Sequence, residues 1–377
     1  MLRTKKGMAI VGLGAIALMA AACGGSSSSS SSGSTASAPA ATDTTAASAG
    51  TSSAGGGTVA LTGAGSTFAA PLYQAWAGPL ASSGVQVNYQ AVGSGAGIQQ
   101  FTAKTVDFGA SVAPMKDADI ATAQTAGGDV LHIPTALGAV VATYNLAGVA
   151  DLKLDGPTLA DIFQGKITKW NDPKIAASNA GVSLPDKPIS VVYRADSSGT
   201  TYVFTGYLSG ASADFKAAVG QDKAPKWPTG TGAPKNDGVA AAVKQTDGAI
   251  GYVELSYALK NSLAFATLKN KAGEWVKASL DSTTKAAQGA QYPADLRFSL
   301  LDSATAGAYP IVSATWVLYW ADPSKAGQSA DKVKAVEAFL SYGLGDGQAG
   351  EAALGYAPLP ADLLALAKQA VTKIKAP

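Results

Sequence analysis

The chain has 377 residues, 47% of them hydrophobic, and a formal net charge of +2. Three of its 28 basic residues (Arg3, Lys5 and Lys6) fall within the first six positions, so the remainder carries 25 basic against 26 acidic residues. Nucleic-acid-binding proteins need a basic surface, and this balance argues against that class. Since Cys23 and His132 are the only cysteine and histidine, no intrachain disulfide can form and no soft metal-ligand cluster is expected.

The N-terminal segment has the features of an export signal. After the basic start, residues 8–22 carry no charge and end in small residues, which predicts a signal peptide over residues 1–22. A run of about 15 apolar residues is short for a membrane span. Cys23 follows as A-A-A-C-G-G, which resembles the lipobox of bacterial lipoproteins and implies that Cys23 is lipidated.

Residues 23–57 are predicted to be a flexible linker behind that lipid anchor. They are almost entirely Ser, Ala, Thr and Gly, and such a composition buries too little apolar surface to offset chain entropy.

From residue 58 onward, short apolar runs alternate with segments of helical periodicity. This alternation predicts an α/β fold with largely parallel sheets. The expected strands are 58–61, 85–89, 129–133, 139–144 and 189–192, and the expected helices are 72–80, 98–101, 159–163, 239–243, 326–342 and 359–374.

The segment Tyr193–Tyr202, Y-R-A-D-S-S-G-T-T-Y, lies between a predicted strand and a predicted helix. Either Ser197 or Ser198 would cap that helix, and Arg194 would stand at the strand's carboxyl end. The first N–H groups of the helix, expected at Gly199, Thr200 and Thr201, would point outward at the positive end of the helix dipole. This arrangement favours an anion, although a capped helix beside a surface arginine would explain the same residues.

Two other strand-to-helix turns repeat these features. T-G-A-G-S-T-F-A-A-P follows the first strand and contains Ser66 and Thr67, and A-V-G-S-G-A-G-I follows the second and contains Ser94. Open α/β sheets bind ligands at the carboxyl ends of their strands, where all three turns would lie. The repetition therefore predicts one shared oxyanion site.

Asp107, in T-V-D-F-G-A-S, admits two interpretations. It can be an ordinary turn or capping residue. Alternatively, its carboxylate accepts the P–OH of phosphate and rejects sulfate, which has no proton to donate. Under this second hypothesis Asp107 is a selectivity filter.

Five motifs together resemble the phosphate-binding protein of bacterial high-affinity phosphate ABC importers. They are T-G-A-G-S-T-F-A-A-P-L-Y, V-N-Y-Q-A-V-G-S-G-A-G-I, V-D-F-G-A-S-V-A-P, I-T-K-W-N-D-P and Y-R-A-D-S-S-G-T-T-Y-V-F. The resemblance implies a type II periplasmic-binding-protein fold, with two α/β lobes and the ligand in the cleft between them. Lobe I would comprise residues 58–140 plus 311–377, and lobe II residues 141–310.

The resemblance also implies a set of phosphate-binding residues: Thr67, Phe68, Ser94, Asp107, Arg194, Ser198, Gly199 and Thr200, with Asp196 pairing with Arg194. The implied function is capture of inorganic phosphate outside the cytoplasm and delivery to the importer's membrane permease. No cofactor, metal or nucleic acid is expected. The protein would be a lipid-anchored monomer on the outer face of the cytoplasmic membrane, or periplasmic if it is not lipidated.

Two alternatives remain open from the residues. One keeps the fold and changes the ligand to another oxyanion, such as sulfate or molybdate. The other is a phosphatase or serine hydrolase using Ser94 or Ser198, but His132 lies in an apolar run and no G-x-S-x-G motif is present. The pairs Tyr73/Trp76 and Trp316/Trp320 are predicted to pack in cores, and W-N-D at 170–172 receives no role from the sequence.

Overall fold

A computed structural model describes residues 58–376. The predicted signal peptide (1–22), the linker (23–57) and the lipidation site Cys23 lie outside these described residues. Between residues 58 and 376, no helix combines the length and the apolar character that a membrane crossing requires.

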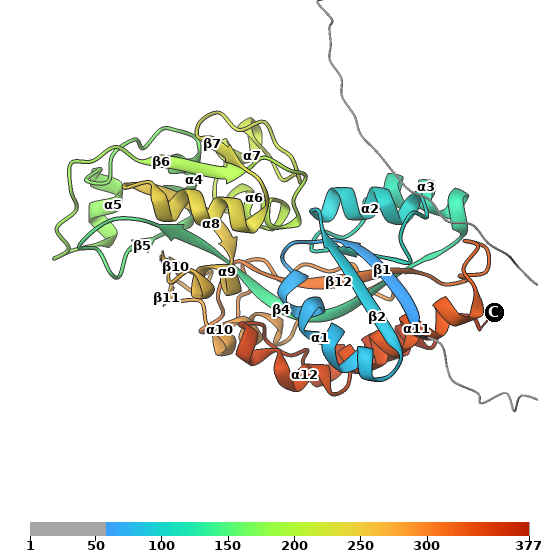
Figure 1. The fold of residues 1–377 in the computed structure, drawn as a ribbon. Coiled ribbons are helices and arrows are strands. Elements are labelled where there is room, and N and C mark those ends of the chain that lie inside the picture. Colours follow the sequence, from blue (N-terminus) through green and yellow to red (C-terminus); the bar gives the residue numbers. More distant parts are fainter. Residues whose placement is uncertain (1–57, 377) are drawn as a thin grey trace, which may run out of the picture. The chain divides into compact units, whose positions relative to one another are not determined.

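Nine strands form one sheet in the order β2-β1-β3-β12-β4-β8-β6-β7, with β9 paired to β4 (Figure 1). Its strands are β1 (Val59–Gly65), β2 (Val85–Ala91), β3 (Phe108–Ser111), β4 (Val130–Tyr144), β6 (Ser190–Arg194), β7 (Thr231–Ala233), β8 (Ala249–Glu254), β9 (Ala264–Phe265) and β12 (Val312–Trp320). A small second sheet contains β5 (Lys153–Leu154), β10 (Thr267–Lys269) and β11 (Trp275–Val276).

Helices alternate with these strands along most of the chain. They are α1 (Ala70–Ser82), α2 (Ser94–Thr102), α3 (Asp117–Gly127), α4 (Gly156–Phe163), α5 (Pro173–Ser178), α6 (Gly199–Ala211), α7 (Ala213–Ala218), α8 (Lys235–Gln245), α9 (Leu255–Lys260), α10 (Leu280–Ala287), α11 (Ala330–Gly343), α12 (Gly347–Gly350), the 3₁₀ turn η1 (Ala352–Leu354) and α13 (Ala361–Val371). The predicted α/β class is confirmed.

The parallel sheet predicted from the sequence is correct at the flanks and wrong at the centre. β1 pairs in parallel with β2 and β3, and β6 pairs in parallel with β7 and β8. In the middle, β12 is antiparallel to both β3 and β4, and β4 is antiparallel to β8. Each flank therefore has the parallel, helix-covered pattern that places strand carboxyl ends at one edge.

Strand β4 joins the two flanks. The two apolar runs predicted as separate strands are one continuous strand of 15 residues. Its first part pairs with β12 as far as Ala139, and from Val140 onward it pairs with β8. One strand thus belongs to both halves of the sheet.

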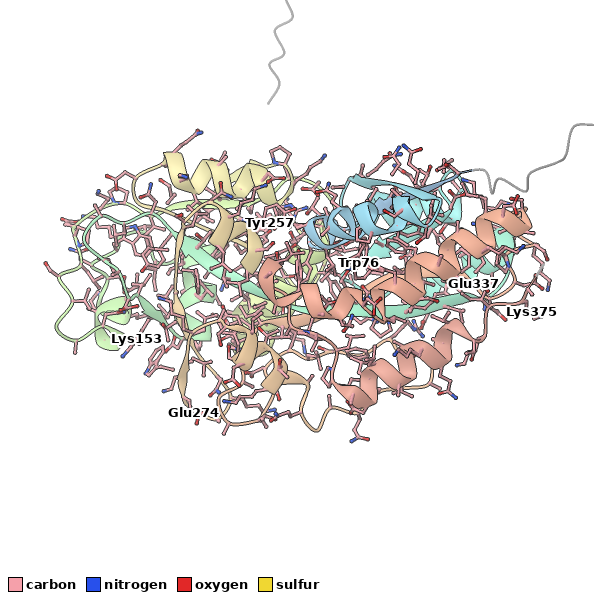
Figure 2. The ribbon with its side chains drawn as sticks, turned by 60° about the horizontal axis from the view of Figure 1, so that its bottom comes forward. Trp76, Lys153, Tyr257, Glu274, Glu337 and Lys375 are labelled. Carbon is pink, nitrogen blue, oxygen red and sulfur yellow. The ribbon has the colours of Figure 1, made fainter. Side chains whose placement is uncertain are left out.

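Aromatic packing holds α1 and α11 against the β1–β3 flank. The ring of Tyr73 lies 5.2 Å from Trp76 and 5.4 Å from Phe339, and Phe339 stacks on Phe108 at 4.8 Å. Figure 2 shows Trp76 on α1 facing the helix α11 that carries Glu337. Tyr73, Trp76, Trp316 and Trp320 are all buried, which confirms their predicted role in cores.

The W-N-D motif has a structural role. The buried Trp170 indole donates a hydrogen bond to the carbonyl of Gly248 at 3.0 Å, and Asp172 caps α5 by accepting from the N–H of Lys174 at 2.8 Å. The motif therefore fixes the loop before α5 against the loop that leads into β8.

Glycines let α2 approach the sheet closely. A Cβ added at Gly97 would lie 2.3 Å from the Cα of Gly65 and 2.8 Å from the carbonyl oxygen of Ala64. Both obstacles are backbone atoms of β1, which cannot rotate away. Only glycine at position 97 therefore allows α2 to lie where it does.

We expect Gly97→Ala to lower the free energy of unfolding by roughly 1–3 kcal/mol, because the added methyl overlaps with fixed backbone. Gly210, in the helix α6, is the matched control, since a Cβ there would meet nothing within 4 Å and the next residue is Ala211. Gly210→Ala should stabilise the protein by about 0.5 kcal/mol through helix propensity. Urea unfolding of both variants measures this, and equal effects of the two substitutions would contradict the packing argument.

Candidate oxyanion-binding site

Three helix N-termini meet beyond the carboxyl ends of β1, β2 and β6. The N–H of Gly95 in α2 donates to the carbonyl of Ser197, just before α6, at 3.0 Å. A Cβ added at Gly199, the first residue of α6, would lie 2.4 Å from Oγ of Ser94, the first residue of α2. The turn before α1 joins them through Thr67, as described below.

Five backbone N–H groups at these turns are available to an external acceptor. In the described part of the chain they donate to no protein acceptor, and they belong to Thr67, Phe68, Ser94, Gly199 and Thr200. The first N–H groups of a helix lack intrahelical partners and carry the positive end of its dipole. The geometry therefore presents one small region with five donors from three helices.

Ser198 is the N-cap of α6, which resolves the choice between Ser197 and Ser198. Its Oγ accepts from the N–H of Thr201 at 3.1 Å. The prediction that Thr201 offers a free N–H is therefore wrong, because that group is used by the cap.

Arg194 lies buried at the end of β6, with 3% of its surface exposed. Its Nε and Nη2 donate to the two carboxylate oxygens of Asp196 at 2.8 and 2.6 Å, and its Nη1 donates to Oγ1 of Thr200 at 3.3 Å. A guanidinium has five N–H donors, so two remain. Asp196 thus fixes the plane of the fork, as the resemblance implied.

The same pair holds Asp196 in its charged form. Burial by itself would raise the pKa of Asp196, but the hydrogen bonds and the positive charge of Arg194 outweigh it, and the pKa lies below its ordinary value. The N–H of Lys235 also donates to Asp196 at 2.9 Å. Both carboxylate oxygens are therefore engaged by donors of the protein.

Asp107 does not belong to this group, and the selectivity-filter hypothesis for it is wrong. It precedes β3, whose register with β1 runs from Gly63↔Phe108 to Gly65↔Ala110, so it lies at the amino end of the strand. Its carboxylate accepts from the N–H of Thr62 and from Lys332, each at 2.7 Å. Asp107 thus has a structural role, but its carboxylate bonds to β1 and α11 and caps no helix, so the interpretation as a turn or capping residue was correct only in part.

The carboxyl end of β3 brings Val112 to the site instead. The N–H of Val112 donates to Oγ of Ser94 at 3.2 Å, and a Cβ added at Gly199 would lie 2.8 Å from the Val112 Cβ. The residue that β3 directs at the helix N-termini is therefore apolar.

Asn236, at the start of α8, was not predicted from the sequence. Its fully buried Nδ2 donates to Oγ1 of Thr67 at 2.9 Å and lies 3.4 Å from Oγ1 of Thr200. Its Oδ1 accepts from the N–H of Glu254 at 3.2 Å, which fixes the orientation of the amide. Tyr257 donates to the Thr67 carbonyl at 2.6 Å. These contacts connect the turn before α1 to α6.

His132 is not placed to serve as a catalytic base. Its Nε2 accepts from the backbone N–H of Met115 at 3.1 Å, so this nitrogen is occupied. Burial and the nearby charge of Arg297 lower its pKa to about 4. The hydroxyls of Ser94 and Ser198 accept backbone N–H groups and make no contact with it.

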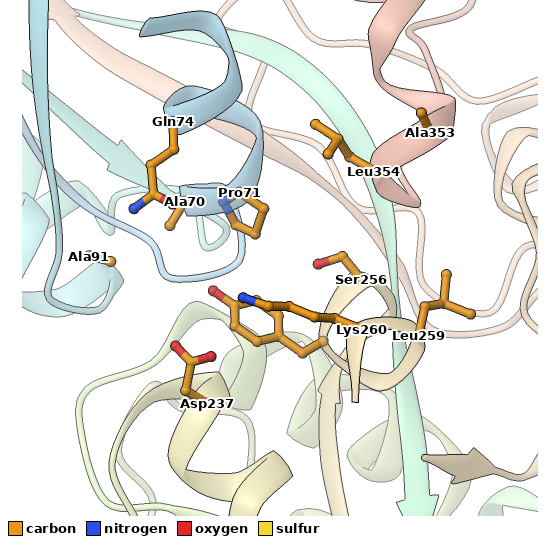
Figure 3. A pocket seen from close by; sticks show the side chains of 11 residues that line it. Ala70, Pro71, Gln74, Ala91, Asp237, Ser256, Leu259, Lys260, Ala353 and Leu354 are labelled. Atoms are coloured by element: carbon orange, nitrogen blue, oxygen red, sulfur yellow. The ribbon is translucent and has the colours of Figure 1, made fainter. Parts of the chain in front are cut away.

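A separate pocket of about 340 Å³ opens beside the start of α1 (Figure 3). It lies between α1, α8, α9 and η1, and none of the predicted phosphate-binding residues lines it. Its lining includes Pro71, Gln74, Asp237, Tyr257 and Leu354.

Comparison with known proteins agrees with the geometry. The profile described as "PBP superfamily domain" matches residues 31–346. "Phosphate-binding protein PstS" of Pasteurella multocida is 43% identical over 309 residues, covering 81% of this chain and 87% of that protein. Its namesake of Haemophilus influenzae is 41% identical, covering 82% and 91%.

Solved structures share the fold at lower identity. The periplasmic phosphate-binding protein PfluDING matches with a TM-score of 0.67 and 23% identity over 82% of this chain and 93% of its own. A phosphate-binding protein from Stenotrophomonas maltophilia matches with a TM-score of 0.64 and 22% identity over 83% and 93%. The fold is that of the two-lobe periplasmic binding proteins, and the chain carries a PBP superfamily domain. Within that class, the chain belongs to the PstS family of phosphate-binding proteins.

Glu254, at the end of β8, is a fully buried acid directly behind the site. A Cβ added at Gly138 would lie 3.5 Å from its Oε1 and 2.5 Å from the ring of Phe68. Its Oε2 accepts from the N–H of Ser256 at 3.0 Å, whereas Oε1 has no partner among the described residues. Burial raises the pKa of Glu254 to about 8.

This raised pKa predicts a pH-dependent stability. The folded state holds the proton of Glu254 more tightly than the unfolded chain does. The stability that this proton contributes to the fold is therefore fully present below pH 4.5 and is lost as the pH rises to about 8. We expect a loss of roughly 2–4 kcal/mol over this interval. Gln cannot ionise, so the Glu254→Gln variant does not lose this stability. The difference in unfolding free energy, variant minus wild type, should therefore increase as the pH rises. Urea unfolding at several pH values tests this, and parallel pH profiles would refute it.

Proposed function

We propose that this protein is an extracytoplasmic solute-binding protein that captures inorganic phosphate and delivers it to an ABC importer. The observation that carries the proposal is the convergence of five free backbone N–H groups and the buried Arg194 on one small region. Such a set of donors matches the oxygens of a tetrahedral oxyanion. The curated relatives are named as phosphate-binding proteins, which supports phosphate as the ligand.

Neutral donors would supply most of the binding energy. Arg194 is the one cation in contact with the three helix turns among the described residues. Hydrogen bonds to a charged partner contribute about 1.5–3 kcal/mol each, and several of them exceed the ordering and desolvation costs of micromolar binding. The helix dipoles add to this attraction without adding net charge.

We further propose that residues 58–140 plus 311–377 form one lobe and residues 141–310 the other. On this division the bond from Asn236 to Thr67, the bond from Tyr257 to Thr67 and the bond from Gly95 to Ser197 all cross between lobes. They would break when the lobes open to admit the ligand and re-form on closure, with β4 as one of the connecting segments.

Attachment and partners follow from the same proposal. Lipidation of Cys23 would tether the body through the linker to the outer face of the cytoplasmic membrane, where a monomer could reach the permease subunits. Without lipidation the protein would be periplasmic.

The alternatives lead to different outcomes. Another oxyanion, such as sulfate or molybdate, would occupy the same donors. A phosphatase or serine hydrolase would need an activated serine, and we propose that this chain is not an enzyme. Sustained hydrolysis of a phosphomonoester by the purified protein would contradict that.

The direct test replaces Arg194 with Lys. We expect this change to weaken phosphate binding by at least about 100-fold, since an ammonium cannot both pair with Asp196 in two places and point donors at the anion. Arg297→Lys is the matched control, because Arg297 also pairs with two acids, Asp117 and Asp295, away from the site. Calorimetric titration of phosphate into each variant measures the effect. Equal affinities of both variants would overturn the proposed site.

Asp107→Asn should lower the stability of the protein and leave its affinity for phosphate nearly unchanged. Because the Asp107 carboxylate is bonded to Lys332 and Thr62, its loss should lower the free energy of unfolding by about 1–2 kcal/mol. Phosphate affinity should stay within about threefold of the wild type, a difference of under about 0.7 kcal/mol. A large loss of affinity in a folded variant would restore Asp107 to the site.

A further inference from the structure

We propose that the binding site of this chain is built from donors alone, so that it accepts sulfate as well as phosphate. This inference rests on the proposed function and specifies the class of ligand, namely tetrahedral oxyanion dianions with or without a proton. It follows from which hydrogen-bond acceptors at the site are already occupied by donors of the protein.

The four hydroxyls at the site already receive hydrogen bonds from the protein. Oγ of Ser94 accepts from the N–H of Val112, and Oγ of Ser198 accepts from the N–H of Thr201. Oγ1 of Thr67 accepts from Asn236, and Oγ1 of Thr200 accepts from Arg194. Each hydroxyl retains its own hydrogen, which is free to point at the anion.

The orientation of the Asn236 amide shows that the Thr67 hydroxyl accepts from Asn236 and does not donate to it. If the amide were reversed, its oxygen would face Thr67 and accept that hydroxyl's hydrogen. The N–H of Glu254 donates to Oδ1 of Asn236, and a reversed amide would place two donors against each other there. Thr67 is therefore left as a donor toward the ligand.

The backbone carbonyls at the turns are also occupied. The Thr67 carbonyl accepts from Tyr257 and the Phe68 carbonyl accepts from Tyr356. The Ser197 carbonyl accepts from the N–H of Gly95. These turns therefore direct N–H groups at the site and direct their carbonyls at other parts of the protein.

The acids near the turns, Asp196, Asp107 and Glu254, do not supply the missing acceptor. Oε1 of Glu254 has no partner among the described residues, but it lies 3.5 Å from where a Cβ on Gly138 would stand, on the side of the Phe68 ring and not of the N–H groups, and Oε2 accepts from the N–H of Ser256. Both oxygens of Asp196 are engaged by Arg194 and the N–H of Lys235. Asp107 lies at the far end of β3, bonded to Lys332. The carboxyl end of β3 contributes Val112, whose Cβ is packed at the first turn of α6.

Selectivity between phosphate and sulfate depends on such an acceptor. The phosphate dianion has one P–OH, whereas sulfate has only acceptor oxygens. A buried carboxylate would pair with the P–OH and repel sulfate, and sites that leave a polar group unpaired reject the wrong ligand by about 10⁴–10⁵-fold. In a site made of donors alone, no acceptor of the protein repels the oxygens of sulfate. The P–OH of phosphate can then donate only to the remaining lone pair of a serine or threonine hydroxyl.

Competition calorimetry on the wild-type protein tests the inference. Phosphate is titrated first into the protein alone and then into the protein with sulfate at rising concentration. We expect sulfate to bind within about 100-fold of phosphate, a difference of under about 2.7 kcal/mol. Phosphate binding with no competition by a 10⁴-fold excess of sulfate would overturn the inference and leave the proposed function intact. Binding of neither anion would overturn the proposed function as well.

A gain-of-selectivity variant provides an independent measurement. Val112→Asp would add a carboxylate beside Ser94 and Gly199, and we expect the ratio of phosphate to sulfate affinity to rise at least about tenfold. Val112→Ala, which adds neither a charge nor a hydrogen-bond acceptor, should leave the ratio within about threefold. An unchanged ratio in a folded Val112→Asp protein would contradict the inference. If that variant does not fold, the wild-type competition decides alone.

Discussion

The structure depends on one requirement of helix chemistry, that the first N–H groups of a helix find acceptors. At seven of the thirteen α-helices between residues 58 and 376 a side chain at the N-cap supplies one, as Ser329 does for α11 and Asp155 for α4. At the turns before α1, α2 and α6, several N–H groups are left without a protein acceptor although the turns are buried. Leaving such groups unsatisfied costs free energy, and an oxyanion bound as proposed would remove that cost at all three turns together.

The remainder of the fold brings these turns together. Glycine at position 97 allows α2 to lie directly against β1, and Ser94 at the start of α2 lies beside the end of β3, where it accepts from the N–H of Val112. β4 runs from one flank of the sheet into the other, so that elements 100 or more residues apart in sequence share hydrogen bonds at the site. Asn236 links the turn before α1 to α6 through hydrogen bonds to Thr67 and Thr200. Because its side chain is uncharged, this link adds no second cation beside Arg194.

The sequence was sufficient to predict the α/β class, the three turns and most residues at them, because each turn combines glycine, a hydroxyl residue and a flanking apolar run. The sequence was insufficient where the position of a residue depends on where a short strand begins or ends. Asp107 stands one residue before a four-residue strand, and the sequence does not tell which edge of the sheet that residue occupies. Asn236 follows β7, a strand of three residues with no apolar run, so the same strand-to-helix pattern was hidden. The β4 strand was divided into two because Pro134 and Gly138 interrupt its apolar run, whereas the structure accommodates an irregular register with β12 near Pro134.

The central claim is that helix N-termini from both flanks of the sheet hold one anion. A crystal structure of the protein grown with phosphate measures this most directly. The account predicts one phosphate with its oxygens about 2.7–3.1 Å from the N–H groups of Thr67, Ser94 and Gly199 and from the guanidinium of Arg194. A phosphate bound elsewhere, or one that contacts only a single helix N-terminus while the other donors remain bonded to water, would contradict it.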